Sequence, residues 1–174
     1  MDIYILRHAE AEDTSPNCKT DAERRLTAKG ERQSADAAAA LREMEVSFDL
    51  ILASPLVRAQ RTAEIVAKAL RLSKRLETTD DLAPGGDPRS LLAAIGRRAE
   101  KLASILLVGH ELELSRLISQ LLAGRPDLRI ELKKAGLCKL TVEELGHDRC
   151  ATLQWLLTAK QLRRMASCGS KAQG

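Results

Sequence analysis

The stretch IYILRHAEAE, residues 3–12, begins as an apolar run and then places an arginine and a histidine side by side. An unbroken apolar run at residues 3–6 predicts a short strand that is buried on both faces. Polar and charged side chains rarely end such a strand for packing reasons, because burial without a partner costs free energy. Arg7 and His8 are therefore candidates for a functional site.

The length and composition are those of an ordinary globular protein. The chain has 174 residues, of which 44% are hydrophobic and 30% are charged, so it is long enough to bury a core without disulfides or metal. We expect one domain over residues 1–158, followed by a basic C-terminal tail, residues 159–174, that is partly disordered. The net charge of +4 is too small to indicate nucleic acid, and no basic stripe is interleaved with aromatic residues. No nucleic-acid partner is expected.

The first apolar run is too short for a signal peptide or a membrane span. We therefore expect a cytoplasmic protein without membrane association. The four cysteines show no CxxC spacing, and a reducing compartment keeps them as thiols: Cys18, Cys138, Cys150 and Cys168. Cys138 and Cys150 could face each other across a late hairpin, but two small core residues are the simpler interpretation.

Short β-rich runs alternate with helical patterns in the first half of the chain, which indicates βαβ units. The predicted strands are residues 3–6, 48–53 and 103–110, followed by a hairpin at or near the sheet edge made by residues 137–145 and 150–157. Thr27, Ser54 and Asp87 are predicted to cap helices, the last two directly before a proline. The pattern predicts a three-layer α/β/α domain with a mostly parallel central sheet.

Polar residues follow three of the predicted strands. Arg7 and His8 follow the first, the segment from Ser54 to Arg58 follows the second, and His110 ends the third. Ligands of open α/β sheets bind outside the carboxyl ends of the strands, so two arginines and two histidines are expected to converge. Guanidinium groups and a helix N-terminus suit a phosphate. A neutral imidazole beside that phosphate can attack phosphorus and form a covalent phosphohistidine.

The histidines also allow other interpretations. Two histidines can share a metal ion with a carboxylate such as Glu10 or Glu111, but two arginines in the same pocket oppose a divalent ion, and no HxH or HExxH spacing is present. We expect no metal and no cofactor. A lone histidine at a strand end is often a satisfied polar residue, and His147, in the predicted hairpin turn, is given no role.

Four motifs, in this order, resemble those of the histidine phosphatase superfamily, which is also called phosphoglycerate-mutase-like: LRHA, LTAKGERQSA, SPLVRAQRTAE and LLVGHE. The short chain and the segments ERRLTAKG and DLAPGGDP are most similar to the SixA-type phosphohistidine phosphatases. The resemblance implies a phosphoglycerate-mutase-like fold. It also implies residue roles: His8 as nucleophile, Arg7, Arg58 and His110 as phosphate-binding residues, and Arg24 at the pocket mouth.

Two departures from the family pattern bear on the reaction. Ala9 stands where the family usually has glycine, which puts a Cβ beside the nucleophile. The region in which larger members place a glutamate proton donor offers only Asp80, Asp81 or Asp87. Loss of a general acid slows departure of an alkoxide by about 10²–10⁴-fold, whereas the imidazole of phosphohistidine carries its own proton. A P–N substrate is favoured, and the alternative is a general phosphomonoesterase in which one aspartate is the donor.

The expected function is hydrolysis of protein phosphohistidine through a covalent phosphohistidine intermediate. Little chain is inserted between the core elements, so an open pocket is expected to admit a histidine-phosphorylated signalling or phosphotransfer carrier. The alternatives are a small-molecule phosphatase of the same superfamily and a non-catalytic phosphate-binding module; a mutase is disfavoured because it needs a deep pocket. The tail cations Lys160, Arg163 and Arg164 either dock an acidic partner or form a solvated helix face.

Overall fold

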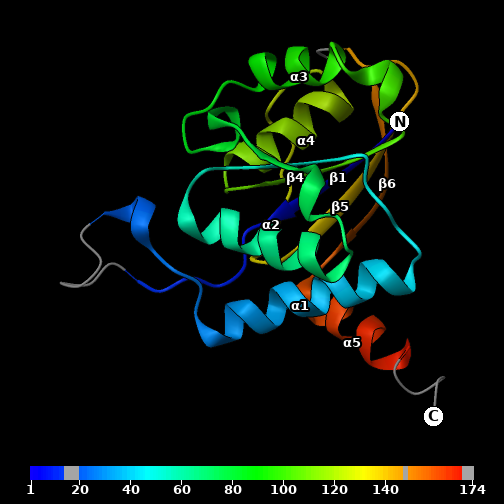
Figure 1. Ribbon diagram of the computed structural model, residues 1–174. Helices are drawn as coiled ribbons and strands as arrows, with labels where there is room; N and C mark the ends of the chain where they lie inside the picture. Colours follow the sequence, from blue (N-terminus) through cyan, green and yellow to red (C-terminus); the bar gives the residue numbers. More distant parts are fainter. Residues whose placement is uncertain (14–19, 147–148, 170–174) are drawn as a thin grey trace.

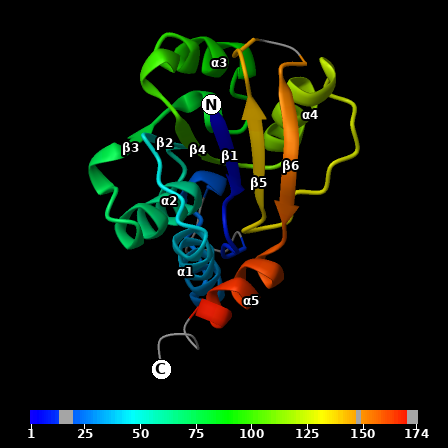
Figure 2. The same cartoon turned by 90° about the vertical axis from the view of Figure 1, so that its right-hand side faces the viewer.

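The computed structural model describes residues 1–13, 20–146 and 149–169 and contains a mixed six-stranded sheet in the order β3-β2-β4-β1-β5-β6 (Figures 1 and 2). The first four strands in that order are parallel to one another, whereas β5 is antiparallel to both of its neighbours. The strands are β1 (Asp2–Arg7), β2 (Leu50–Ala53), β3 (Leu76–Thr78), β4 (Ser104–Gly109), β5 (Leu137–Val142) and β6 (Ala151–Leu157). This sheet confirms the predicted mostly parallel arrangement and the hairpin at its edge.

Helices cover both faces of the sheet (Figure 1). One face packs against α1 (Ala28–Glu43), α2 (Val57–Ala69) and α5 (Ala159–Gly169), and the other packs against α3 (Pro88–Gly96) and α4 (Glu113–Ala123). Short 3₁₀ turns connect these elements: η1 (Asp21–Glu23), η2 (Ser73–Arg75), η3 (Asp80–Leu82) and η4 (Ala99–Lys101). The three-layer α/β/α fold predicted from the sequence is therefore confirmed.

The central strands are apolar along their whole length because each face of the sheet lies under helices. In β1, Ile3 and Ile5 pack with α3 and α4, whereas Tyr4 and Leu6 pack with α1 and α2. Successive side chains of a strand point to opposite faces, so four apolar residues in a row are what a doubly covered strand requires. The run ends at Arg7, where the strand leaves the core.

Two of the three predicted helix caps are confirmed. The Thr27 side chain accepts a hydrogen bond from Gly30 N at the start of α1, and the Asp87 side chain accepts one from Arg89 N at the start of α3. The prediction for Ser54 was wrong, because α2 begins at Val57 and Leu56 is its N-cap. Ser54 is fully buried at the end of β2, and its hydroxyl is engaged by a histidine of the site described below.

Strand β3 was missed in the sequence. It has three residues, and only the first, Leu76, is partly buried, so it carries neither an apolar run nor an alternating pattern. Cys138 and Cys150 are free thiols, and Cys138 lies opposite Leu156 in the β5–β6 register. Burial raises the pKa of Cys138 to about 12, which fits the interpretation as a small core residue.

The segment predicted as a C-terminal tail contains α5, which lies along α1 (Figure 1). Its Leu162 is fully buried and packs in the same cluster as the α1 side chains. Residues 170–174, Cys18 and His147 lie outside the described residues, and the division at residue 158 stays a prediction. Within the described ranges, no helix combines the length and the apolar character needed to cross a membrane.

Candidate active site

The residues that follow β1, β2 and β4 meet at one edge of the sheet. These strands are parallel neighbours, so their carboxyl ends lie together, and the ring centroids of His8 and His110 are 5.0 Å apart. Arg58 reaches the same place from the first turn of α2, and its Nε lies 3.3 Å from His8 Nε2. His8, Arg58 and His110 are 6%, 4% and 2% exposed. The predicted convergence of these groups is confirmed in its geometry.

The hydrogen bonds of His8 define which ring nitrogen carries the proton. Nδ1 lies 2.7 Å from the carbonyl oxygen of Ala9, and because a carbonyl only accepts, Nδ1 must donate. The lone pair then belongs to Nε2, which accepts the hydrogen bond that Arg58 Nε donates. The unprotonated nitrogen of His8 therefore faces a guanidinium group, where a bound anion would also lie.

The surroundings keep His8 uncharged. Burial lowers its pKa to about 3, and the hydrogen bond to Ala9 opposes this only in part. Protonation of His110 and the charges of Arg58 and Arg7 lower the same pKa further. At neutral pH the ring is the free base, which is the form that can act as a nucleophile.

His110 is oriented by Ser54. The Ser54 hydroxyl accepts from Leu56 N at 3.3 Å and lies 2.8 Å from His110 Nε2, so it can give its own proton to that nitrogen. His110 Nδ1 then carries the hydrogen, and it is buried without a partner among the described residues. Burial lowers the pKa of His110 to about 4, with Arg58 as the next cause. In this tautomer the neutral His110 keeps one N–H free to donate to a bound group.

Arg58 already holds an oxyanion of the protein itself. Its Nη2 lies 2.7 Å from Asp21 Oδ2, and its Nη1 donates to the Asp21 backbone oxygen at 2.5 Å. Asp21 also accepts from Arg24 Nη1 at 2.9 Å, and this bond is the main reason why the pKa of Asp21 lies below its usual value, with Arg58 adding to it. The guanidinium fork is thus presented for carboxylate or phosphate oxygens.

The remaining two predicted residues occupy the margin of the site. Arg7 Nη1 donates to the Leu132 carbonyl at 3.0 Å, and its Nε is buried without a partner in the described part of the chain. Arg24 reaches Asp21 and the Glu12 carbonyl, and within the described ranges Asp21 is the residue that links it to Arg58. The sequence did not single out Asp21, because nothing in a linear pattern indicates a contact between residues 37 positions apart.

Ala9 is accommodated without backbone strain. Its side chain is fully buried, and it is absent from the residues with positive φ, so the freedom of a glycine is not required here. Its N–H donates to Thr62 Oγ1 at 3.2 Å, and that hydroxyl donates to the Arg58 carbonyl at 2.7 Å. Thr62, another residue that sequence reasoning missed, thus ties the segment carrying His8 to the helix that carries Arg58.

The three candidate proton donors lie in the η3 turn and at the start of α3. Asp87 accepts from Arg89 N as a helix cap, and Asp81 accepts from the Thr79 hydroxyl at 3.4 Å. Asp80 is exposed in η3. In the described part of the chain, none of these carboxylates makes a hydrogen bond or ion pair with the histidines or Arg58.

The carboxylates proposed for a metal site have other partners. Glu10 pairs with Lys29 at 2.6 Å, and Glu111 accepts a hydrogen bond from Ser115. Across residues 1–13, 20–146 and 149–169, no three His, Cys, Asp or Glu side chains are grouped as ligands of one metal ion.

Because two histidines are buried in the neutral form, the stability of the protein is expected to depend on pH. In the unfolded chain each takes up a proton near pH 6.5, whereas in the folded protein the pKa values are about 3 and about 4. Below pH 6.5 the unfolded state therefore binds more protons than the folded state, so the free energy of unfolding decreases as the pH is lowered. Between pH 7 and pH 5 we expect the free energy of unfolding to drop by about 2 kcal/mol for each histidine. Urea denaturation in phosphate-free buffer at both pH values measures this drop.

A His8→Ala variant serves as the control for this pH effect. Its free energy of unfolding should depend on pH by about 2 kcal/mol less than that of the wild type over the same interval. An equal dependence in both proteins would contradict a buried, neutral His8.

Known proteins resemble this chain in sequence. The sequence profile of the Histidine phosphatase superfamily (branch 1) matches residues 3–83. The chain is 31% identical over 133 residues to a phosphohistidine phosphatase SixA homolog of Haemophilus influenzae, covering 72% of this chain and 79% of that protein. It is 27% identical over 165 residues to phosphohistidine phosphatase SixA of Escherichia coli K12, covering 94% and 97%.

A solved structure gives the same result for the fold. The structure of the protein histidine phosphatase SixA complexed with tungstate superposes with a TM-score of 0.81 at 26% sequence identity, covering 93% of this chain and 99% of that one. Arg7, His8 and Arg58 lie within the segment that the profile matches.

Proposed function

The chain belongs to the histidine phosphatase superfamily, and we propose that it is a phosphohistidine phosphatase that removes the phosphoryl group from histidine-phosphorylated proteins. The observation that carries the proposal is the neutral His8, whose unprotonated Nε2 faces Arg58 and lies beside the His110 ring. The names of its SixA-type relatives supply the substrate class. The cytoplasm is the location that we propose for it.

In the first step, the lone pair of His8 Nε2 forms a bond to the phosphorus of the substrate while the P–N bond of the substrate breaks. The substrate imidazole leaves with that electron pair, and because its other nitrogen carries a proton, it leaves as a neutral ring. Arg58 and Arg7 balance the negative charge on the three equatorial oxygens. His110 Nδ1–H donates to one of them.

In the second step, a water oxygen attacks the phosphoryl group on His8 and the His8 N–P bond breaks. The electron pair returns to Nε2, the proton of the water goes to solvent, and inorganic phosphate is released. Because Ala9 holds a proton on Nδ1, His8 also leaves as a neutral imidazole. Both P–N bonds therefore break without a dedicated acid, and none of the steps requires a metal ion.

The proposal is tested with a histidine-phosphorylated carrier protein in buffer containing EDTA. We expect many phosphate ions to be released per enzyme molecule, measured as free phosphate and as loss of phosphohistidine, at a rate that EDTA does not change. Release that stops after addition of EDTA and returns with a divalent metal would contradict the metal-free mechanism. Tight binding of phosphate without any release would favour a phosphate-binding module.

A further inference from the structure

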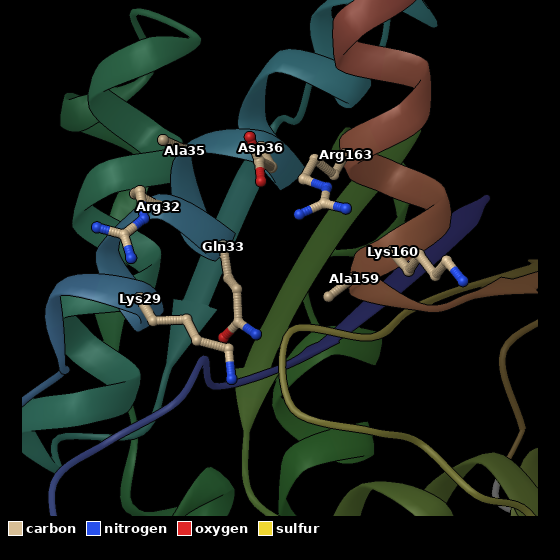
Figure 3. Close-up of a pocket in the computed structure, with 8 residues that line it drawn as sticks. All are labelled: Lys29, Arg32, Gln33, Ala35, Asp36, Ala159, Lys160 and Arg163. Atoms are coloured by element: carbon tan, nitrogen blue, oxygen red, sulfur yellow. The ribbon is translucent and has the colours of Figure 1, made fainter.

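A groove separates α1 from α5 on one face of the sheet (Figure 3). Its volume is about 590 Å³, and its lining comes from these two helices alone: Lys29, Arg32, Gln33, Ala35 and Asp36 of α1, and Ala159, Lys160 and Arg163 of α5. In Figure 3, Arg163 extends from α5 into the space between the helices, and Arg32 and Lys160 flank it on the outer sides. We call this feature the basic groove.

The positive charge of the basic groove is largely uncompensated. Four of its side chains are cationic and one, Asp36, is anionic. Lys29 pairs with Glu10, whereas Arg32, Lys160 and Arg163 make no ion pair with any described residue. Some arginines elsewhere on the surface have carboxylate partners, namely Arg61, Arg75, Arg98 and Arg125. The lining of the groove thus carries three cations without an ion pair to a described residue and one anion.

The packing of α5 explains why Arg163 enters the groove. Leu162 is fully buried against an alanine-rich face of α1, and small side chains let two helices approach closely. Arg163 follows this anchor directly, whereas Lys160 precedes it by two residues and, at 3.6 residues per turn, lies on the far side of the helix. Burial of Leu162 therefore places Arg163 between the helices, and Lys160 extends the positive charge outward (Figure 3).

The basic groove adjoins the candidate active site. Gln33 Oε1 accepts from the Glu10 backbone N–H at 3.0 Å, and Lys29 pairs with the Glu10 side chain at 2.6 Å. Glu10 lies two residues after His8. Strand β6 runs parallel to β1, since both are antiparallel to β5, so β6 leads into α5 at the edge of the sheet where His8 lies (Figure 2).

We propose that the basic groove binds an acidic segment of the phosphoprotein whose phosphohistidine enters the site. This inference rests on the proposed function, because it assigns a docking surface to the same substrate. Charge complementarity and the position beside His8 argue for it. A nucleic acid is a poorer match, since base stacking needs exposed aromatic rings, whereas Tyr4 and Phe48 are buried in the core and Trp155 is partly buried against it.

Two synthetic peptides test the proposal. Each carries one phosphohistidine between two six-residue arms, and the arms are glutamate-rich in one peptide and glutamine-rich in the other. Six extended residues span about 20 Å, enough to reach from the site along a neighbouring helix. At low salt we expect the wild type to prefer the glutamate peptide by about tenfold in kcat/KM, and 0.5 M NaCl should abolish most of this preference.

Charge-removing variants test whether the preference for the glutamate peptide comes from the basic groove. The triple variant Arg32→Gln/Lys160→Gln/Arg163→Gln should lose the preference while hydrolysing the glutamine peptide at the wild-type rate. The matched control Lys74→Gln/Arg97→Gln/Lys101→Gln removes the same charge from residues that precede β3 and β4, at the opposite edge of the sheet. The control should keep the preference. Equal losses in both triple variants, or no preference in the wild type, would overturn the docking assignment.

Binding separates this inference from the proposed function. Fluorescence anisotropy with the labelled, unphosphorylated glutamate peptide should show weaker binding to the groove variant than to the wild type or the control. Hydrolysis of both peptides at equal rates would contradict the docking role of the groove and would still support the phosphatase activity. Groove-dependent binding without hydrolysis would support the docking role of the groove and contradict the phosphatase activity. Binding of a single-stranded RNA of equal charge as tightly as the peptide would assign the groove to polyanions in general and overturn an acidic protein segment.

Discussion

The His8→Ala variant is expected to lose at least about 10⁴-fold in turnover of phosphohistidine, because no other group can form the covalent intermediate in its place. Its Nε2 is the unprotonated nitrogen that faces Arg58, and His110 cannot replace it, since its Nε2 is held by Ser54. The measurement is single-turnover loss of phosphohistidine from a carrier protein, with circular dichroism to verify the fold.

The third histidine of the chain provides the matched control. His147→Ala removes the same side chain from a residue with no assigned role and should keep the wild-type rate. A labelled phosphoryl group should also appear on the wild-type protein after rapid quenching and be absent from His8→Ala. Activity of His8→Ala within tenfold of the wild type would assign the nucleophile to another residue.

The site residues that could be predicted from the sequence are those placed by topology. Arg7, His8 and His110 each follow an apolar run, and such runs become adjacent parallel strands. Their convergence needs only the rule that ligands bind at the carboxyl ends of such strands. The positions of these residues can therefore be predicted from the order of the strands along the chain.

The residues that sequence reasoning missed act through contacts distant in the chain. Ser54 was assigned to a helix cap because Ser-Pro is a strong local signal, yet its hydroxyl orients His110, 56 residues away. Asp21 pairs with Arg58 across 37 residues. The basic groove joins α1 to α5, at opposite ends of the chain. Local patterns carry no information about such pairs, which arise only when the layers pack.

A strong preference for P–N over P–O bonds is the second large effect that we expect. For two peptides of identical sequence, one with phosphohistidine and one with phosphoserine, kcat/KM should differ by about 10²–10⁴-fold in favour of phosphohistidine. A serine alkoxide must take up a proton as it leaves, whereas an imidazole protonated on its other nitrogen leaves neutral. His8 likewise leaves as a neutral imidazole when its own P–N bond breaks, because the Ala9 carbonyl keeps a proton on Nδ1.

Aspartate variants decide whether a general acid exists. Asp87 caps α3 and Asp81 is bonded to Thr79, so the exposed Asp80 is the carboxylate most available to a substrate. Asp80→Asn and Asp81→Asn should each change phosphohistidine turnover by less than about threefold. Phosphoserine turnover within tenfold of phosphohistidine turnover, lost in one of these variants, would instead establish a general phosphomonoesterase. In that case the η3 turn, which abuts the end of β4 at Gly109, would be the element that supplies the acid.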